Sequence, residues 1–187
     1  MDSKAAILDA ARRLFAERGY NGATIREVAA MAGVSPAMVM KTVGSKEALY
    51  AAARPMDTDQ YERELPQDGL GYELVRRILA RRDDGEAEPW ARALFLTQQS
   101  PDPELSRAEF HQKYLAYLAE RVSDGPDKPQ RVSQIACMLI GLASGVRTMR
   151  LLAADESDSE TVVACYGGLI QSLVDGCPPP RRPVRRR

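Results

Sequence analysis

Apolar residues recur at helical spacing along most of the chain, and this pattern predicts a protein built from helices. The first helix is expected from Ser3 to Arg18 and is ended by Gly19. It carries one apolar stripe that consists of Ile7, Leu8, Ala11, Leu14 and Phe15. Later helices are expected between clusters of Pro, Gly and Asp, at Gly69 to Arg82, Pro89 to Gln99, Pro103 to Ser123, Pro129 to Ala153 and Ser159 to Asp175.

Two short helices joined by a tight turn are predicted over residues 24–43. Thr24 and Glu27 have the spacing of a capping box, in which each side chain accepts a hydrogen bond from the backbone amide of the other residue. Gly33 can adopt the left-handed conformation that ends a helix, and Ser35 can cap the helix that follows. The pattern therefore predicts two consecutive helices with a very short connection.

A connection this short forces the two helices to cross steeply, which is typical of a helix-turn-helix. The steep crossing requires a small residue at Ala29 and an apolar side chain at Val39 to fill the junction. An ordinary helical hairpin is the alternative interpretation. A third helix, expected from about Ser45 to Arg54, would link this unit to the rest of the chain.

Three segments in this order, ILDAARRLFAERGY, TIREVAAMAGVS and VGSKEALY, resemble the tetracycline-repressor (TetR) family of bacterial transcriptional regulators. The resemblance covers about residues 4–54, and beyond residue 54 only the helical layout matches. It implies an all-α fold with a three-helix, helix-turn-helix head and a C-terminal helical body. The domains expected are a DNA-binding domain at 1–50, an effector-binding and dimerisation domain at 51–177, and a disordered basic tail at 178–187.

The same resemblance implies which residues meet DNA. They are Thr24, Arg26, Ser35, Pro36, Ala37, Met38, Met40, Lys41, Thr42 and Lys46. Lys41 is the candidate for reading guanine, with a phosphate contact as its alternative, while Thr24 and Lys46 match positions used on phosphates. Arg26 could reach a base edge, clamp a phosphate or remain solvated. The chain has Met40 and Thr42 where the family commonly has tyrosines, so the operator cannot be inferred from relatives.

Charge is divided unevenly along a chain whose formal net charge is zero. Residues 1–47 carry a net charge of +2, residues 48–180 carry −7, and residues 181–187 carry +5. Of the two predicted helical parts, the head is therefore the one whose net positive charge suits it to bind a polyanion. No signal segment or membrane span is recognised in the sequence, and a cytoplasmic protein without membrane partners is expected.

An enzyme is not expected, because the chain has one histidine and no nucleophile elbow, phosphate-binding glycine loop or metal-ligand spacing. No catalytic residue, metal or cofactor is therefore assigned. The three cysteines form no CxxC motif, and Cys137 and Cys165 are interpreted as buried packing residues. Cys177, beside the tail, is the most reactive candidate by exposure.

The last two helices are apolar around more than one face, which predicts a four-helix interface with a second copy of the chain. The interface residues expected are Ile135, Leu139, Val146, Val162, Tyr166, Leu169 and Leu173. Gly141 with Gly145, and Gly167 with Gly168, would allow the close approach of backbones. A core formed within one chain is the alternative.

An effector cavity in the body is implied by the family resemblance. The residues expected to line it are Tyr72, Trp90, Phe95, His111, Tyr114, Met138 and Leu142. Such a lining suits a small, mostly apolar molecule, although aromatic residues at helical spacing are more often ordinary core. The function expected is a ligand-responsive repressor that binds a palindromic operator as a homodimer and is released by a small-molecule effector. The alternative is a TetR-like protein that has lost operator reading and acts by binding another protein.

Overall fold

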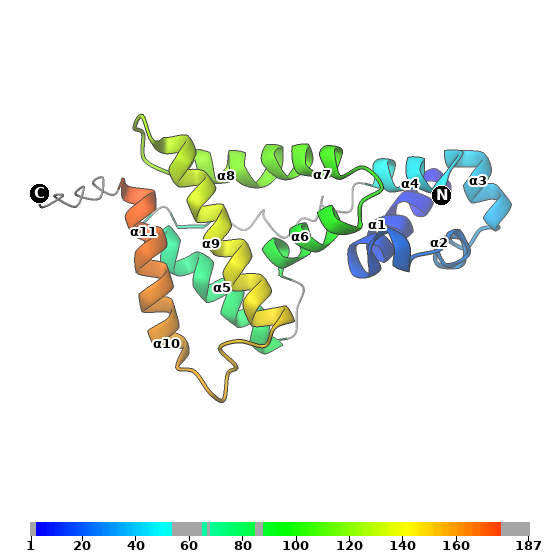
Figure 1. The fold of residues 1–187 in the computed structure, drawn as a ribbon. Helices are drawn as coiled ribbons and strands as arrows, with labels where there is room; N and C mark the ends of the chain where they lie inside the picture. The colour runs from blue at the N-terminus through cyan, green and yellow to red at the C-terminus, as the bar shows by residue number, and fades with distance from the viewer. Residues whose placement is uncertain (1–2, 54–64, 67, 85–87, 177–187) are drawn as a thin grey trace, which may run out of the picture. The chain divides into compact units, whose positions relative to one another are not determined.

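The computed structural model of the chain describes residues 3–53, 65–66, 68–84 and 88–176, and every element in these ranges is a helix (Figure 1). The expected all-α fold is therefore confirmed. The chain forms two compact units, which we call the head unit (residues 1–64 and 87–113) and the body unit (residues 65–86 and 114–187). The predicted tail at 178–187 and Cys177 lie outside the described residues.

The head unit begins with four helices, α1 (Ser3–Gly22), α2 (Ile25–Ala32), α3 (Pro36–Val43) and α4 (Lys46–Ala53). Their apolar faces enclose one core, in which the predicted stripe of α1 is buried except for the partly covered Leu8. The backbone of α1 leaves the helical conformation at Gly19, with φ 69° and ψ 178°, where the sequence predicted an end.

Two later helices, α6 (Pro89–Gln99) and α7 (Pro103–Phe110), belong to the same head unit. Gly19 lets α6 approach α1 closely, because a Cβ atom at this position would lie 3.0 Å from Gln99 Cβ. The Asn21 side-chain amide also donates to Gln99 Oε1 over 3.2 Å. By its packing α6 thus belongs to the head unit, while the domain bounds expected from the sequence stay a prediction.

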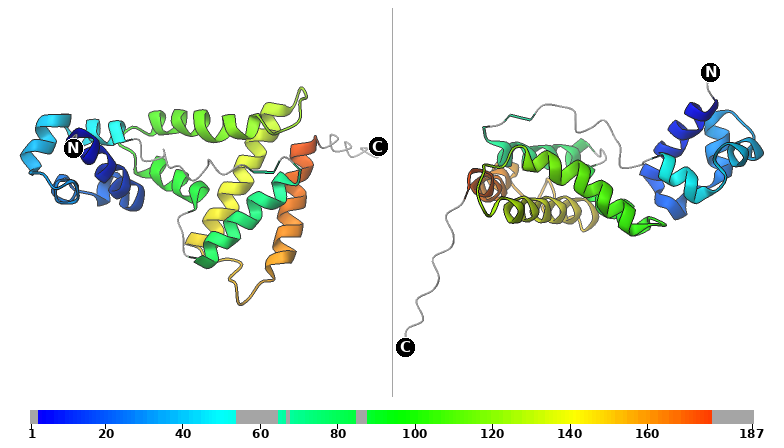
Figure 2. Two further views of the ribbon diagram at one scale, coloured as in Figure 1. Left: turned by 180° about the vertical axis from the view of Figure 1, so that it is seen from behind. Right: turned by 90° about the horizontal axis from the view of Figure 1, so that it is seen from above.

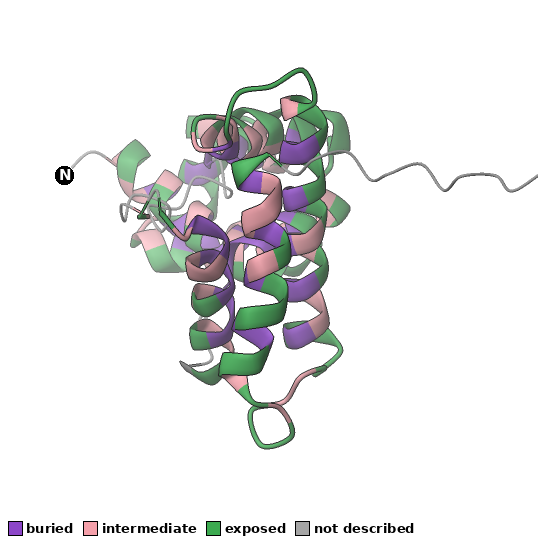
Figure 3. Cartoon of the chain, turned by 90° about the vertical axis from the view of Figure 1, so that its left-hand side faces the viewer, coloured by how far each residue is buried: buried purple, intermediate pink, exposed green. Residues whose placement is uncertain are grey.

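The body unit contains α5 (Leu70–Asp84), α9 (Lys128–Thr148) and α11 (Gly168–Asp175), which pack side by side (Figure 2). Buried residues line their facing sides, as Figure 3 shows in purple. Two expected long helices are interrupted by π-helical turns. One is α7, continued by η2 (His111–Leu115) and α8 (Ala116–Ala119), and the other is α10 (Ser159–Val162), continued by η3 (Val163–Gly167) and α11.

One helix is shorter than predicted, because α9 ends at Thr148 and not at Ala153. The carbonyl oxygen of Gly145 accepts hydrogen bonds from the amides of both Met149 (3.2 Å) and Leu151 (3.1 Å), which closes the helix. The apolar pattern continues past this point and cannot reveal that the backbone turns away.

Two glycines let α5 come into backbone contact with η3 and α11. A Cβ atom on Gly71 would lie 2.5 Å from the backbone nitrogen of Gln171, and one on Gly167 would lie 2.8 Å from Tyr72 Cα. The amide of Gly71 also donates to Gln171 Oε1 over 2.8 Å. The close approach expected of Gly167 therefore occurs with a helix of the same chain.

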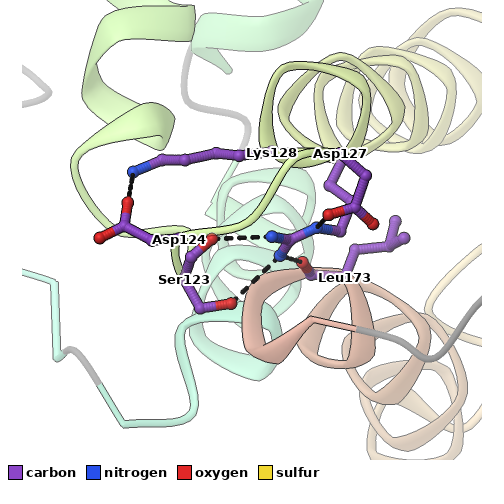
Figure 4. A network of polar contacts seen from close by, with 6 residues as sticks. Ser123, Asp124, Asp127, Lys128 and Leu173 are labelled. Atoms are coloured by element: carbon purple, nitrogen blue, oxygen red, sulfur yellow. Dashed lines mark hydrogen bonds and ion pairs between the residues drawn. The ribbon is translucent and has the colours of Figure 1, made fainter.

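A buried arginine joins the first turn of α9 to the end of α11 and to the loop that follows α8 (Figure 4). Arg131 is only 3% exposed and donates through Nε to Asp127 Oδ1 over 3.1 Å. Its Nη1 donates to the carbonyl of Leu173 over 2.7 Å, and its Nη2 donates to the carbonyl of Ser123 over 2.7 Å. The cation thus satisfies backbone oxygens at the ends of chain segments that would otherwise lack donors.

Candidate nucleic-acid interface

The amino end of α2 is fixed by the predicted capping box. Thr24 Oγ1 accepts from the amide of Glu27 over 3.2 Å, and Glu27 Oε2 accepts from the amide of Thr24 over 2.9 Å. Hydrogen bonds from Thr24, with a smaller contribution from the Arg18 guanidinium, lower the pKa of the Glu27 carboxyl below its usual value. The Thr24 side chain remains exposed at the surface.

The turn between α2 and α3 follows the predicted chemistry. Gly33 is left-handed, with φ 69° and ψ 29°, and the amide of Val34 donates back to the carbonyl of Ala29 over 3.0 Å. Ser35 then caps α3, because its Oγ accepts from the amide of Met38 over 3.2 Å. These local bonds set the direction in which α3 leaves the turn.

The α3 helix has one buried edge and a broad exposed face. Val39 is fully buried in the head core, as the sequence predicted, and this core also contains Ala29, while Val43 is partly covered. The predicted contact residues of α3 and its cap are all exposed: Ser35, Pro36, Ala37, Met38, Met40, Lys41 and Thr42. Arg26 on α2 is exposed as well. The fold therefore presents this face to solvent with apolar methionines and one cation upon it.

The amino end of α4 carries a cluster that the sequence did not reveal. Tyr20 donates its hydroxyl to Glu47 Oε1 over 2.5 Å, and the Lys46 ammonium lies 4.4 Å from the centre of the Tyr20 ring. The hydrogen bond to Glu47, with some burial, raises the pKa of Tyr20 to about 12, and the same bond lowers the pKa of Glu47. We call Tyr20, Lys46 and Glu47 the α4 cluster. The cation–π contact holds Lys46 at the helix end, where anions are favoured.

The predicted effector-cavity residues are divided between the two units. In the head unit Trp90 is buried and meets Phe110 edge to face, with 6.1 Å between ring centres, whereas Phe95 and His111 are exposed. In the body unit Tyr114 and Leu142 are buried, and Tyr72 and Met138 are partly covered. The assignment of these residues to an effector cavity stays a prediction.

The predicted dimer residues also separate into two groups. Ile135, Leu139, Val146 and Val162 are buried in the core of the chain itself. Leu173 is half-buried, and the exposed members are Tyr166 (36%) and Leu169 (59%). The periodicity correctly identified an apolar stripe on α9, but helices of the same body unit cover it.

The interpretation of the cysteines as buried packing residues was wrong, because both Cys137 and Cys165 are exposed. Cys137 follows the buried Ile135 by two positions on α9, and two positions turn a side chain by roughly 200° around a helix. Cys137 and the exposed Gly141 therefore lie away from the core stripe. Among the described residues, no helix combines the length and apolar character needed to span a bilayer.

Comparison with known proteins covers both parts of the chain. Residues 7–53 match the family model described as bacterial regulatory proteins of the tetR family, and residues 68–174 match that of the tetracyclin repressor-like C-terminal domain. The HTH-type transcriptional repressor AcnR of Corynebacterium efficiens is 34% identical over 119 residues, which are 62% of this chain and 61% of that protein. AcnR of Corynebacterium glutamicum is 32% identical over 133 residues, or 69% of each chain.

A solved structure shows the same architecture. A TetR-family regulator from Streptomyces coelicolor A3 superposes with a TM-score of 0.53 and 29% sequence identity, over 92% of this chain and 94% of that one.

Proposed function

The chain belongs to the TetR family of bacterial regulatory proteins. We propose that it is a transcriptional repressor that binds operator DNA through α3. The observation that carries the proposal is the division of α3 into a buried edge at Val39 and an exposed face that includes Lys41. An exposed face on a capped, well-anchored short helix suits insertion into a major groove. Its site of action would be the cytoplasm, because its proposed partner is chromosomal DNA.

The residues proposed to contact DNA have two different roles. Lys41, exposed in the last turn of α3, would donate to the N7 and O6 acceptors of guanine. Thr24 and Lys46, which lie at the amino ends of α2 and α4, would contact phosphates, where backbone amides add donors. The exposed Met38 and Met40 side chains are suited to thymine methyl groups.

The experiment compares lysine variants on the DNA upstream of the gene and on random DNA. Lys41→Ala should cost about 1–3 kcal/mol at one base position of each half-site. Lys46→Ala should weaken binding to every sequence alike and reduce the salt slope by about 1. Arg13→Ala removes a cation of the head whose side chain is exposed and paired with Asp9, and it should leave discrimination unchanged.

A salt titration separates this function from its alternative. Counterion release makes the affinity of a true DNA binder fall steeply as salt rises. Absence of binding to the upstream DNA, or a response that is flat in salt, would favour the protein-binding alternative. Equal loss on every sequence for Lys41→Ala would remove that residue from base reading.

We also propose that the repressor acts as a homodimer and that a small effector releases it from DNA. Two recognition helices about 34–36 Å apart would fit successive major grooves of a palindromic site. The surface proposed for dimerisation is the exposed side of α9 and η3–α11, with Cys137, Gly141, Tyr166 and Leu169. Leu169→Glu should then shift the protein toward monomers in sedimentation velocity, whereas a monomeric wild type would refute the dimer.

A further inference from the structure

The starting observation is a cavity in the head unit that none of the predicted effector residues lines. It has a volume of about 330 Å³ and lies between α4 and the segment formed by α7 and the turn before it. Ala48, Ala51 and Leu105 supply apolar surface to its wall. The volume falls at the lower end of the range found for small-molecule sites.

The charged residues that line the cavity are all acidic. Three carboxylates line the cavity, those of Glu47, Asp102 and Glu109, while the lining contains no lysine, arginine or histidine. Tyr50, which also lines it, has its pKa raised to about 12 by burial first and by the charge of Glu109 as well. The wall thus combines negative potential with a compact apolar surface.

The polar groups of the wall are held in place by hydrogen bonds. Asp102 Oδ1 accepts from the amide of Leu105 over 3.0 Å and caps α7. The buried hydroxyl of Ser106 donates to Ser100 Oγ over 2.7 Å. Glu47 accepts from Tyr20 in the α4 cluster. An ionised carboxylate has about four acceptor sites, so Asp102 can accept a further donor and still cap α7.

We propose that this cavity binds a small organic cation, with an ammonium group among Glu47, Asp102 and Glu109 and a compact apolar body against Leu105 and the alanines of α4. An ammonium group supplies donors only, which matches a wall of acceptors. A charge-assisted hydrogen bond to fixed carboxylates gives orientation as well as affinity.

The position of Glu47 connects the cavity to the proposed DNA contact, and this part of the inference rests on the proposed function. Glu47 lies both in the cavity wall and in the α4 cluster, where it accepts from Tyr20 while the Tyr20 ring holds Lys46. An ammonium that attracts the Glu47 carboxylate into the cavity weakens its bond to Tyr20 and loosens Lys46. Cation binding and DNA binding therefore oppose each other, and each lowers the affinity of the other by the same factor.

The binding experiment uses the full chain without DNA. Phenethylammonium is titrated into ¹⁵N-labelled protein, and amide shifts of α4 and α7 are followed by NMR. The neutral analogue 2-phenylethanol should bind at least about tenfold more weakly, because it cannot form charged hydrogen bonds. Glu109→Gln should weaken binding of the cation about fivefold, as expected for one partly solvated charge.

A matched pair of variants tests the location. Ala51→Leu places a larger side chain in the cavity wall, whereas Ala52→Leu makes the same change at the next position of α4, which is exposed and does not line the cavity. Ala51→Leu should weaken the cation at least about tenfold through lost volume, and Ala52→Leu should leave it unchanged. No saturable shifts, equal affinity of the neutral analogue, or equal effects of the two leucines would each overturn the site.

A second measurement tests the coupling. With DNA that the wild type binds, saturating phenethylammonium should lower affinity about fivefold or more, and Tyr20→Phe should abolish this response. Cation binding without any change in DNA affinity would refute the coupling through Glu47 and leave the site standing. Absence of DNA binding in the cation-free protein would instead refute the proposed function, since the NMR titration does not depend on it.

Discussion

Replacing Gly167 by alanine should destabilise the chain, whereas the same substitution at Gly168 should not. The two glycines are consecutive and have the same helical backbone, with φ −61° and ψ −44° at Gly167 and φ −61° and ψ −42° at Gly168. A Cβ atom on Gly167 would lie 2.8 Å from Tyr72 Cα and 2.6 Å from Tyr72 Cδ1. On Gly168 it would meet only the Tyr72 hydroxyl, at 3.5 Å, which is an ordinary contact.

The expected magnitude follows from comparing these two surroundings. Alanine gains about 0.5–1 kcal/mol over glycine in a helix, and this gain is shared by both variants. The contact at Gly167 involves the backbone of α5, so the helix must move, and overpacking of this kind costs about 1–3 kcal/mol. Gly167→Ala should therefore be less stable than Gly168→Ala by about 1–3 kcal/mol, with Gly168→Ala near or above the wild type.

The assay is urea unfolding followed by circular dichroism, with the midpoint converted to a free energy of unfolding. It should be repeated at several protein concentrations, because dimerisation would make the midpoint depend on concentration. Equal stability of the two variants would refute the close packing of η3 on α5. If Gly167→Ala instead weakened self-association without changing unfolding of the monomer, the glycine would contact a second chain.

Three further outcomes follow from the head unit. Gly33→Ala should lower the free energy of unfolding by about 1 kcal/mol, because φ at this position is +69°, which strains an alanine. Steric clash does not contribute, since nothing lies within 4 Å of the added Cβ atom. An unchanged urea midpoint would contradict this expectation. Tyr20→Phe should weaken DNA binding about two- to fivefold in a fluorescence titration, because the released Glu47 carboxylate lies beside Lys46 and competes with phosphate for its charge. Adding Glu47→Gln to this variant should restore binding. The lowered pKa of Glu27 means that its capping box contributes stability that is present above the usual value of 4.5 and is lost as the pH falls below it. Urea midpoints measured on both sides of that value should therefore fall less steeply with acid in Glu27→Gln than in the wild type.

The helix-turn-helix could be predicted because its determinants are local in sequence. The capping box joins residues three positions apart, and the left-handed turn depends on Gly33 alone. The hydrogen bonds that define the ends of α2 and α3 are therefore determined by a short stretch of sequence. The exposed and buried edges of α3 followed from the same helical spacing, with Val39 inward.

The remaining features depend on contacts between residues that are distant in sequence. The apolar stripe of α9 indicated that Ile135 and Leu139 are buried, but it could not indicate whether they pack against helices of the same chain or of a second chain. The bond between Tyr20 and Glu47 joins two helices of the head, and neither residue type signals the other. A tyrosine directly after the glycine that interrupts α1 is the only local hint. The cavity beside α4 likewise arises from packing of α7, which the sequence placed in a different domain.

The hydrogen bonds of Arg131 should slow hydrogen exchange at the carboxyl end of α11. Terminal helices usually fray, and their last amides exchange hydrogen with water long before the rest of the protein opens. Here the Leu173 carbonyl is held by Arg131, and the Ser123 amide donates to the carbonyl of Val174 over 2.9 Å. The final turn of α11 should therefore exchange as slowly as the middle of α9. Arg131→Met, which keeps most of the apolar stem, should release this turn to rapid exchange.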